Sequence, residues 1–279
     1  MKPHILKTEI RRVFSGGGMK TAILVGVVIV VLEFVMVTWP AATFDPYTQY
    51  PDGDWGVPYQ LWISWLGGDS PISLPAYLYR LLLPVLAALP FSTSYATDVS
   101  SGYIRQIAIR ADKRRYLLSK MFGVWFGGGL AAVLPLVISF LAAMTVLPMR
   151  GPHRMVNTIV GSNQIFGELY ADTPLLYLFL FSLMIFAFCG AMALIGLFIS
   201  LYVQQPFLVL ITPFTLYLGA DIVARRLDPI HADSFLPMQF LHPNQWMVGR
   251  PDIVFGEMFL LILIFGGGFY LIASRRDTI

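Results

Sequence analysis

The feature that most constrains this chain is a set of six apolar runs, each long enough to cross a membrane, since a spanning helix needs about 20 apolar residues. The runs are Thr21–Trp39, Leu74–Ser94, Ser119–Leu147, Leu175–Val203, Pro206–Ala224 and Ile253–Ser274. Only 13% of the 279 residues are charged, whereas about 25% is usual in soluble proteins. We therefore predict an all-α polytopic protein in which residues 21–279 form one six-helix transmembrane domain within a lipid bilayer.

The distribution of Lys and Arg predicts the orientation of these runs. Thirteen of the 19 basic residues lie in segments 1–20, 95–120 and the C-terminal tail, and loops rich in Lys and Arg stay in the cytoplasm. The loop Pro40–Ser73 has four Asp residues and no Lys or Arg, as expected on the outside. Both termini are therefore predicted to be cytoplasmic. Because the basic residues lie at the ends of apolar runs, orientation explains the pI near 9.0, and no nucleic-acid partner is expected.

Residues 1–20 are predicted to form an amphipathic helix at the cytoplasmic surface of the membrane. On a helical wheel, apolar and basic side chains fall on opposite halves, which is typical of interfacial helices. The apolar half holds Ile5, Leu6, Ile10, Val13 and Phe14, and the basic half holds Lys7, Arg11 and Arg12.

The cytoplasmic loop at 95–118 has its own pattern. Tyr103, Ile104 and Ile107 recur at helical spacing and form one apolar stripe, while Arg105 and Arg110 lie off it. A short helix with such a stripe needs a cover. The residues alone leave open whether lipid headgroups or another protein provides it.

The order of motifs in this region carries a family resemblance. An acidic-x-x-Ser-Gly element is followed by the short amphipathic helix, a basic cluster and a Tyr…Lys pair that leads into the third run. The residues are Asp98, Ser101, Gly102, Arg114, Arg115, Tyr116 and Lys120. Together with the six-run layout, this arrangement resembles the permease subunits of type 2 ABC exporters.

The resemblance implies that the loop is a coupling helix, which docks in a groove of a separate P-loop ATPase subunit. Tyr103, Ile104 and Ile107 would pack into the groove, with Arg105 and Arg110 at its rim. Ser101, Gly102, Arg114 and Arg115 would complete the interface. The resemblance also implies a second permease copy or a sister permease, and a location in the cytoplasmic (inner) membrane of a bacterium.

The chain itself lacks the motifs of an ATPase or another enzyme. The segment Ser15–Thr21 has Gly, Lys and Thr, but a P-loop needs G-x-x-x-x-G-K-[ST] between a strand and a helix. We find no H-E-x-x-H and no G-x-S-x-G motif. No catalytic, cofactor or metal site is therefore expected in this chain, and ATP and Mg²⁺ belong to the partner.

Two charges fall inside the predicted spans. Glu33 and Arg80 each lie six residues from the outer end of a run, about 9 Å deep at 1.5 Å per residue. Charges at such depth usually have a partner, so we expect an ion pair, or else a role for one of them in a substrate pathway. Asp221 and Glu257 lie near the outer ends of their runs, as ordinary interfacial carboxylates or as part of a pathway or dimer contact. The glycines Gly127–Gly129 and Gly266–Gly268 predict close helix packing.

The sequence thus predicts the transmembrane subunit of an ATP-driven exporter, with an amphipathic peptide, antibiotic or lipid as cargo. The alternative is a membrane sensor or immunity protein that binds an antimicrobial peptide through Pro40–Ser73 without transporting it. An intramembrane enzyme is disfavoured by the missing catalytic motifs.

Overall fold

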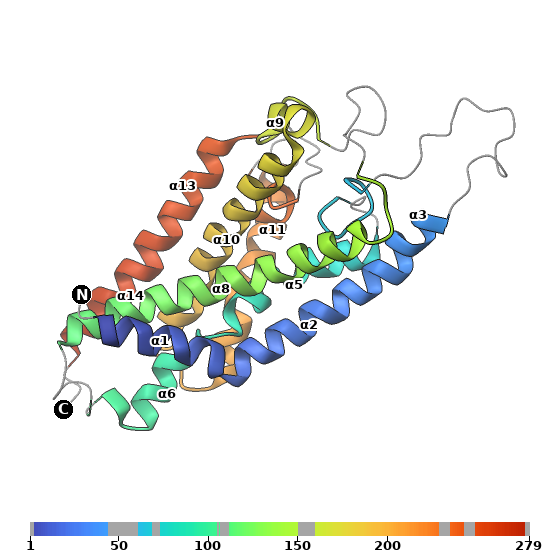
Figure 1. Ribbon diagram of the computed structural model, residues 1–279. Helices are drawn as coiled ribbons and strands as arrows, with labels where there is room; N and C mark the ends of the chain where they lie inside the picture. Colours follow the sequence, from blue (N-terminus) through green and yellow to red (C-terminus); the bar gives the residue numbers. More distant parts are fainter. Residues whose placement is uncertain are drawn as a thin grey trace, which may run out of the picture.

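The protein is helical throughout the part that the structure describes. The computed structural model describes residues 3–43, 61–68, 73–104, 106, 112–149, 160–228, 235–242 and 249–276, and these ranges form helices and no strands (Figure 1). The all-α class expected from the sequence is therefore confirmed.

Five helical segments within the described ranges are long and apolar enough to cross a membrane. They are Gly17–Thr43 (α2, η1 and α3), Lys113–Met144 (α8), Pro174–Ile199 (α10), Pro206–Leu227 (α11) and Pro251–Arg275 (α13, η3 and α14). The π-helical turns η1 (Phe34–Thr38) and η3 (Ile262–Gly267) interrupt the first and the last of them. These segments support a multi-pass membrane protein.

The second predicted span, Leu74–Ser94, is the exception. α5 (Leu74–Ala88) has only 15 residues, about 22 Å at 1.5 Å per residue. The chain then leaves the helix and starts a new one, α6 (Ser94–Ser100). The continuous helix expected over Leu74–Ser94 is not observed: α5 ends two residues before Pro90, which has no amide hydrogen to donate to a helix. Ser92 Oγ, inside the break, donates to the carbonyl of Ala193 in α10 at 3.0 Å.

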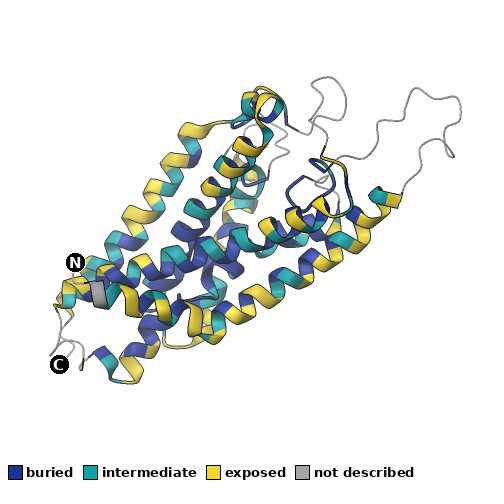
Figure 2. Cartoon of the chain, in the orientation of Figure 1, coloured by how far each residue is buried: buried dark blue, intermediate teal, exposed yellow. Residues whose placement is uncertain are grey.

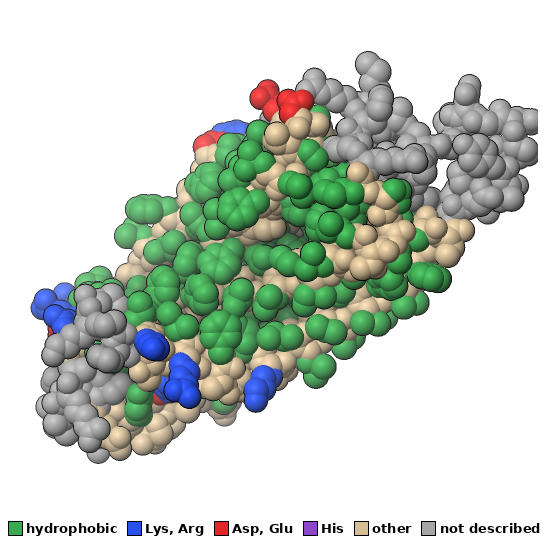
Figure 3. Space-filling view, in the orientation of Figure 1, with side chains coloured by type: hydrophobic (Ala, Val, Ile, Leu, Met, Phe, Trp, Pro, Cys, Tyr) green, Lys and Arg blue, Asp and Glu red, His purple; other side chains and the backbone are tan. Residues whose placement is uncertain are grey.

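One end of the helix bundle gathers segments that are distant in sequence. Figure 1 shows α1 (Pro3–Ser15), α6 and the end of α14 (Gly268–Arg275) together there. Lys113 Nζ, at the start of α8, donates to the carbonyls of Ser274 (3.1 Å) and Arg276 (2.5 Å). Figure 3 shows basic side chains at this end. We call it the basic end; its exposed basic residues include Lys7, Arg11, Arg114, Arg115 and Arg275.

α8 forms the centre of the bundle, in contact with α1, α2, α5 and α10. Figure 2 shows the buried side chains concentrated along α8 and α10. Glycine permits this packing: a Cβ atom at Gly127 would lie 2.9 Å from Val13 Cγ1 of α1, and one at Gly128 would lie 2.7 Å from the Ala87 carbonyl of α5. Close packing through these glycines is therefore confirmed, whereas a Cβ at Gly267 would meet nothing within 4 Å.

Candidate functional site

A buried carboxylate, Asp98, joins three helices at the basic end. It lies in α6, just before the loop that follows, and its side chain is 1% exposed. Arg12 of α1 donates to it through Nη1 (3.2 Å) and Nη2 (2.5 Å). From α8, Tyr116 Oη and Lys120 Nζ both donate to Asp98 Oδ2 at 2.5 Å. Asp98 therefore receives hydrogen bonds from α1 and from α8 at the same time.

A second carboxylate, Glu9, balances the charge. Arg12 Nη1 donates to Glu9 Oε1 at 2.9 Å, and Lys120 Nζ lies 2.8 Å from Glu9 Oε2 in an ion pair without hydrogen-bond geometry. The side chains of Glu9 and Lys120 are 1% and 0% exposed. Two acids and two bases thus neutralise each other, as a buried charged group requires. We call Glu9, Arg12, Asp98, Tyr116 and Lys120 the charge cluster.

The environment keeps Asp98 and Arg12 ionised at neutral pH. Burial alone would raise the pKa of Asp98, but the hydrogen bond from Arg12 and the charge of Lys120 outweigh it and hold that pKa below its usual value. Burial opposes the charge of Arg12 as well, yet its bonds to Asp98 and Glu9 raise its pKa. Both groups are therefore charged under physiological conditions, and their attraction holds α1 against α6.

Aromatic rings and a turn complete this region. The guanidinium of Arg12 lies 4.7 Å from the centre of the Tyr103 ring, and Lys120 Nζ lies 4.5 Å from that of Phe91, within the range of cation–π attraction. Gly102 follows α6 with φ of +70°, a conformation that glycine adopts without steric cost. The turn at Gly102 brings Tyr103 back over Arg12.

The predicted interface residues separate into three groups. Ile104 is only 7% exposed and packs into the hydrophobic core, with Tyr103 packed against it, so the apolar stripe faces the body of the protein at these positions. Ser101, Arg114 and Arg115 are exposed, and Gly102 is partly exposed. Arg105, Ile107 and Arg110 lie outside the described residues.

Arg12 was predicted to lie on the basic half of an interfacial helix, and Glu9 was not predicted to have a role. The signal was present, however. Glu9 lies four residues from both Ile5 and Val13, so it falls within the apolar stripe of α1. A carboxylate on an apolar stripe needs a buried partner, and the structure supplies two, Arg12 and Lys120.

The expected ion pair between Glu33 and Arg80 is not among the salt bridges of the described residues. Both side chains are buried, Glu33 in α2 and Arg80 in α5. Arg80 Nε donates to the Ala76 carbonyl at 3.4 Å, and the Arg80 side chain lines a small cavity with Leu136 and Ile185. That cavity lies between α5, α8 and α10.

The two outer carboxylates have different surroundings. Asp221 accepts hydrogen bonds from Arg225 Nε, four residues further along α11, at 3.1 and 3.3 Å. Glu257 is half-buried and lines an apolar cleft between α10, α11 and α13. The structure does not bring Asp221 and Glu257 together, and Asp221 forms an ordinary ion pair with Arg225 at the surface of α11.

We expect the charge cluster to open in acid. The contribution of Asp98 is fully present above the pKa of an unfolded Asp, about 3.9, and is lost as the pH falls through its lower folded pKa. Spin labels attached through Thr8→Cys and Thr97→Cys, both at exposed positions, would report the separation of α1 and α6 by electron spin resonance. The native Cys189 is buried and should not take up the label. The distance distribution should stay narrow from neutral pH to about 5 and broaden below about 4. Broadening that begins near neutral pH would contradict the assignment.

Comparison of the chain with known protein families, with curated proteins and with solved structures finds no match to any of them. Among the described residues, no group of three or more His, Cys, Asp or Glu side chains could hold a metal ion.

Proposed function

We propose that this chain is the membrane subunit of an ATP-driven exporter of the ABC type, coupled to a separate ATPase. One observation carries the proposal: Asp98, at the end of α6, is bonded to both α1 and α8 directly before the loop at 101–112. A partner that pushes on this loop moves α6, and the charge cluster passes the displacement to two further helices. The packed glycines of α8 then relay it to α5 and α10 as rigid-body motion.

The remaining parts of the proposal follow the sequence pattern. The basic end faces the cytoplasm of a bacterium, both termini lie there, and α1 rests at the inner membrane surface. A second copy or a sister permease encloses the transport path. The ATPase binds ATP and Mg²⁺, and this chain performs no covalent chemistry.

The burial of Ile104 changes the expected docking surface. Val99 of α6 is 42% exposed, and Ser100, Ser101 and Gln106 around it are exposed as well. Arg114 and Arg115 add positive charge nearby. We infer that Val99 is the apolar anchor of this surface and that the two arginines lie at its rim, because interfaces concentrate their energy in a few such residues.

The test is capture of the chain from its own host after mild cross-linking, with P-loop ATPases identified by mass spectrometry and ATP hydrolysis measured on the complex. We expect Val99→Asp to reduce the captured ATPase about tenfold or more, as loss of an interface anchor does. Leu227→Asp is the matched control. Leu227 is also an exposed apolar residue (80%), but it is the last residue of α11 and lies away from the loop at 101–112.

Two outcomes would refute the exporter proposal. One is the absence of any P-loop ATPase from the proteins captured with the wild type, whereas equal capture by the wild type and Val99→Asp would refute only Val99 as the anchor. The other is ATP hydrolysis by the purified chain alone. Ile104→Asp is unsuitable for this test, because Ile104 is buried and a charge there would disturb folding.

A further inference from the structure

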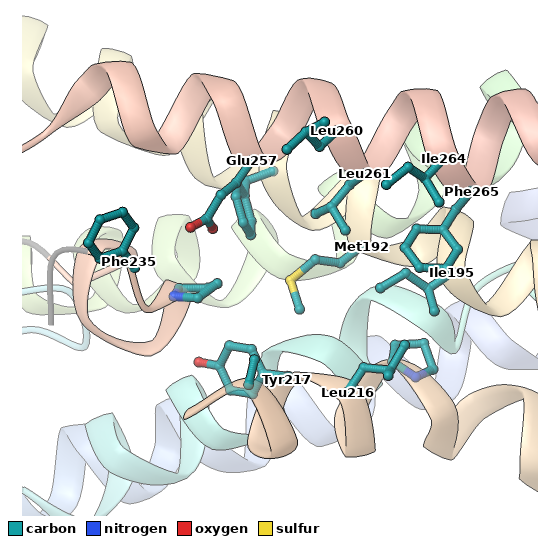
Figure 4. Close-up of a pocket in the computed structure, with 14 residues that line it drawn as sticks. Met192, Ile195, Leu216, Tyr217, Phe235, Glu257, Leu260, Leu261, Ile264 and Phe265 are labelled. Carbon is teal, nitrogen blue, oxygen red and sulfur yellow. The ribbon is translucent and has the colours of Figure 1, made fainter. Parts of the chain in front are cut away.

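The bundle contains an apolar cleft, and Glu257 is the only acidic group among the described residues that line it. The cleft has a volume of about 390 Å³ and lies between α10, α11 and the α13–η3 segment. Figure 4 shows the Glu257 carboxylate directed into the space between these helices, near Phe235 and above Tyr217. Cavities of about 300–1,000 Å³ hold drug-sized ligands.

The walls of the cleft are almost entirely apolar. Met192 comes from α10, Leu216 and Tyr217 from α11, and Leu261, Ile264 and Phe265 from the α13–η3 segment. The Tyr217 hydroxyl already donates to the Arg80 carbonyl at 3.3 Å. Of the lining residues that the structure describes, Glu257 is therefore the only ionisable side chain open to pair with a ligand.

Glu257 has no hydrogen bond or ion pair with any residue that the structure describes. It lies six residues after Pro251, where α13 begins, about 9 Å along the helix at 1.5 Å per residue. This position is within the apolar segment Pro251–Arg275. The other carboxylate expected near the outer face, Asp221, pairs with Arg225. A carboxylate at such a position is costly and calls for a partner or a functional role, and no described side chain supplies a cation.

We propose that this cleft binds an amphipathic molecule with a protonated amine, whose charge pairs with Glu257 and whose apolar body lies along Ile264 and Phe265. The rings of Phe235 and Tyr217 flank the cationic end and add cation–π attraction. Phe265 lies about two helical turns beyond Glu257 towards the basic end, so the ligand lies along the helices with its charge outermost. The binding of this molecule does not depend on the proposed export function. Its role as the cargo does depend on that function.

The test uses the purified chain in phosphatidylcholine nanodiscs, because this lipid has no N–H donor. The probes are dodecylamine, dodecanol and laurate, which share a chain length and differ in the charge of the headgroup. Empty discs correct for partitioning into lipid. We expect saturable binding of dodecylamine, weaker by about tenfold or more in Glu257→Gln, since a charge-assisted bond is lost.

Three further measurements decide the result. Asp252→Asn, an exposed carboxylate of the same helix paired with Arg250, should bind dodecylamine as the wild type does. Leu216→Trp, which fills the cleft, should weaken binding of the amine while the thermal stability of the chain stays unchanged. In discs with phosphatidylethanolamine, a lower apparent affinity for dodecylamine would identify the lipid amine as the natural occupant.

The proposal is overturned if dodecanol binds as tightly as dodecylamine, or if Glu257→Gln binds dodecylamine as the wild type does. A third test uses Leu260→Cys, since Leu260 lines the cleft. If this cysteine forms a disulfide between two chains and the linked pair no longer binds dodecylamine, the proposal is also overturned, because a second copy would then fill the cleft. These outcomes leave the ATPase capture untouched. Conversely, amine binding without stimulation of a captured ATPase would refute the export function and leave the site in place.

Discussion

Replacement of Asp98 with Asn should lower the free energy of unfolding by about 3–5 kcal/mol, the usual effect of breaking a buried ion pair. The change leaves the Lys120 ammonium, fully buried, with only Glu9 as a charged partner, and it weakens the bond from Arg12. It also removes the charged acceptor of Tyr116. Reversible unfolding in mixed micelles, followed by tryptophan fluorescence, measures the effect.

The control for this prediction is Asp221→Asn. Its pair with Arg225 lies at the helix surface, and such i,i+4 pairs contribute only about 0.3–0.5 kcal/mol.

The double variant Asp98→Asn with Lys120→Met should lose less stability than the sum of the two single changes, because the two groups interact directly. Additive losses would show that Asp98 and Lys120 do not stabilise each other.

Gly128→Ala should destabilise the centre of the bundle by about 1–3 kcal/mol, the range for overpacked cores. The new methyl group would lie 2.6 Å from Ala193 Cβ and 2.7 Å from the Ala87 carbonyl. Since backbone atoms of α5 cannot move as a side chain does, α8 must shift away from α5 and α10. We expect the same unfolding assay to detect this loss even though alanine favours helices.

Gly256→Ala on α13 is the matched control, because a Cβ there would meet nothing within 4 Å. With no clash to offset it, the higher helix propensity of alanine should leave stability unchanged or raise it by up to about 1 kcal/mol. If both substitutions had the same effect, close packing at Gly128 would not be the reason for its glycine.

The sequence predicted the long apolar helices well, because hydropathy depends on neighbouring residues alone. α10 and α11 begin within a residue of their predicted starts at Leu175 and Pro206. α8 begins earlier than predicted, at Lys113 rather than Ser119. Its first turns, before Ser119, are rich in charged residues and were therefore excluded by hydropathy, yet Tyr116 in them is buried through its bond to Asp98.

The candidate site was only partly predictable. The motif contained Asp98, Tyr116 and Lys120 among its seven residues but did not predict that they contact one another. Arg12 lies 86 residues from Asp98 in the chain, and no local periodicity links such distant positions. Ile104 shows the opposite limit: helical spacing defines a stripe but does not say which neighbour covers it. The cleft at Glu257 depends on how three separate helices diverge, which a linear sequence does not specify.

The short α5 has a consequence for how the protein enters the membrane. A stretch of about 22 Å is less than the hydrocarbon thickness of about 30 Å, and α5 also contains Arg80 and Pro84. Alone in lipid, it would leave polar backbone at its end without hydrogen-bond partners. Its bonds to protein come from segments synthesised later, Tyr79 Oη to Ala132 and Ser92 Oγ to Ala193. We therefore expect this segment to become stable in the membrane only once α8 and α10 can provide these contacts.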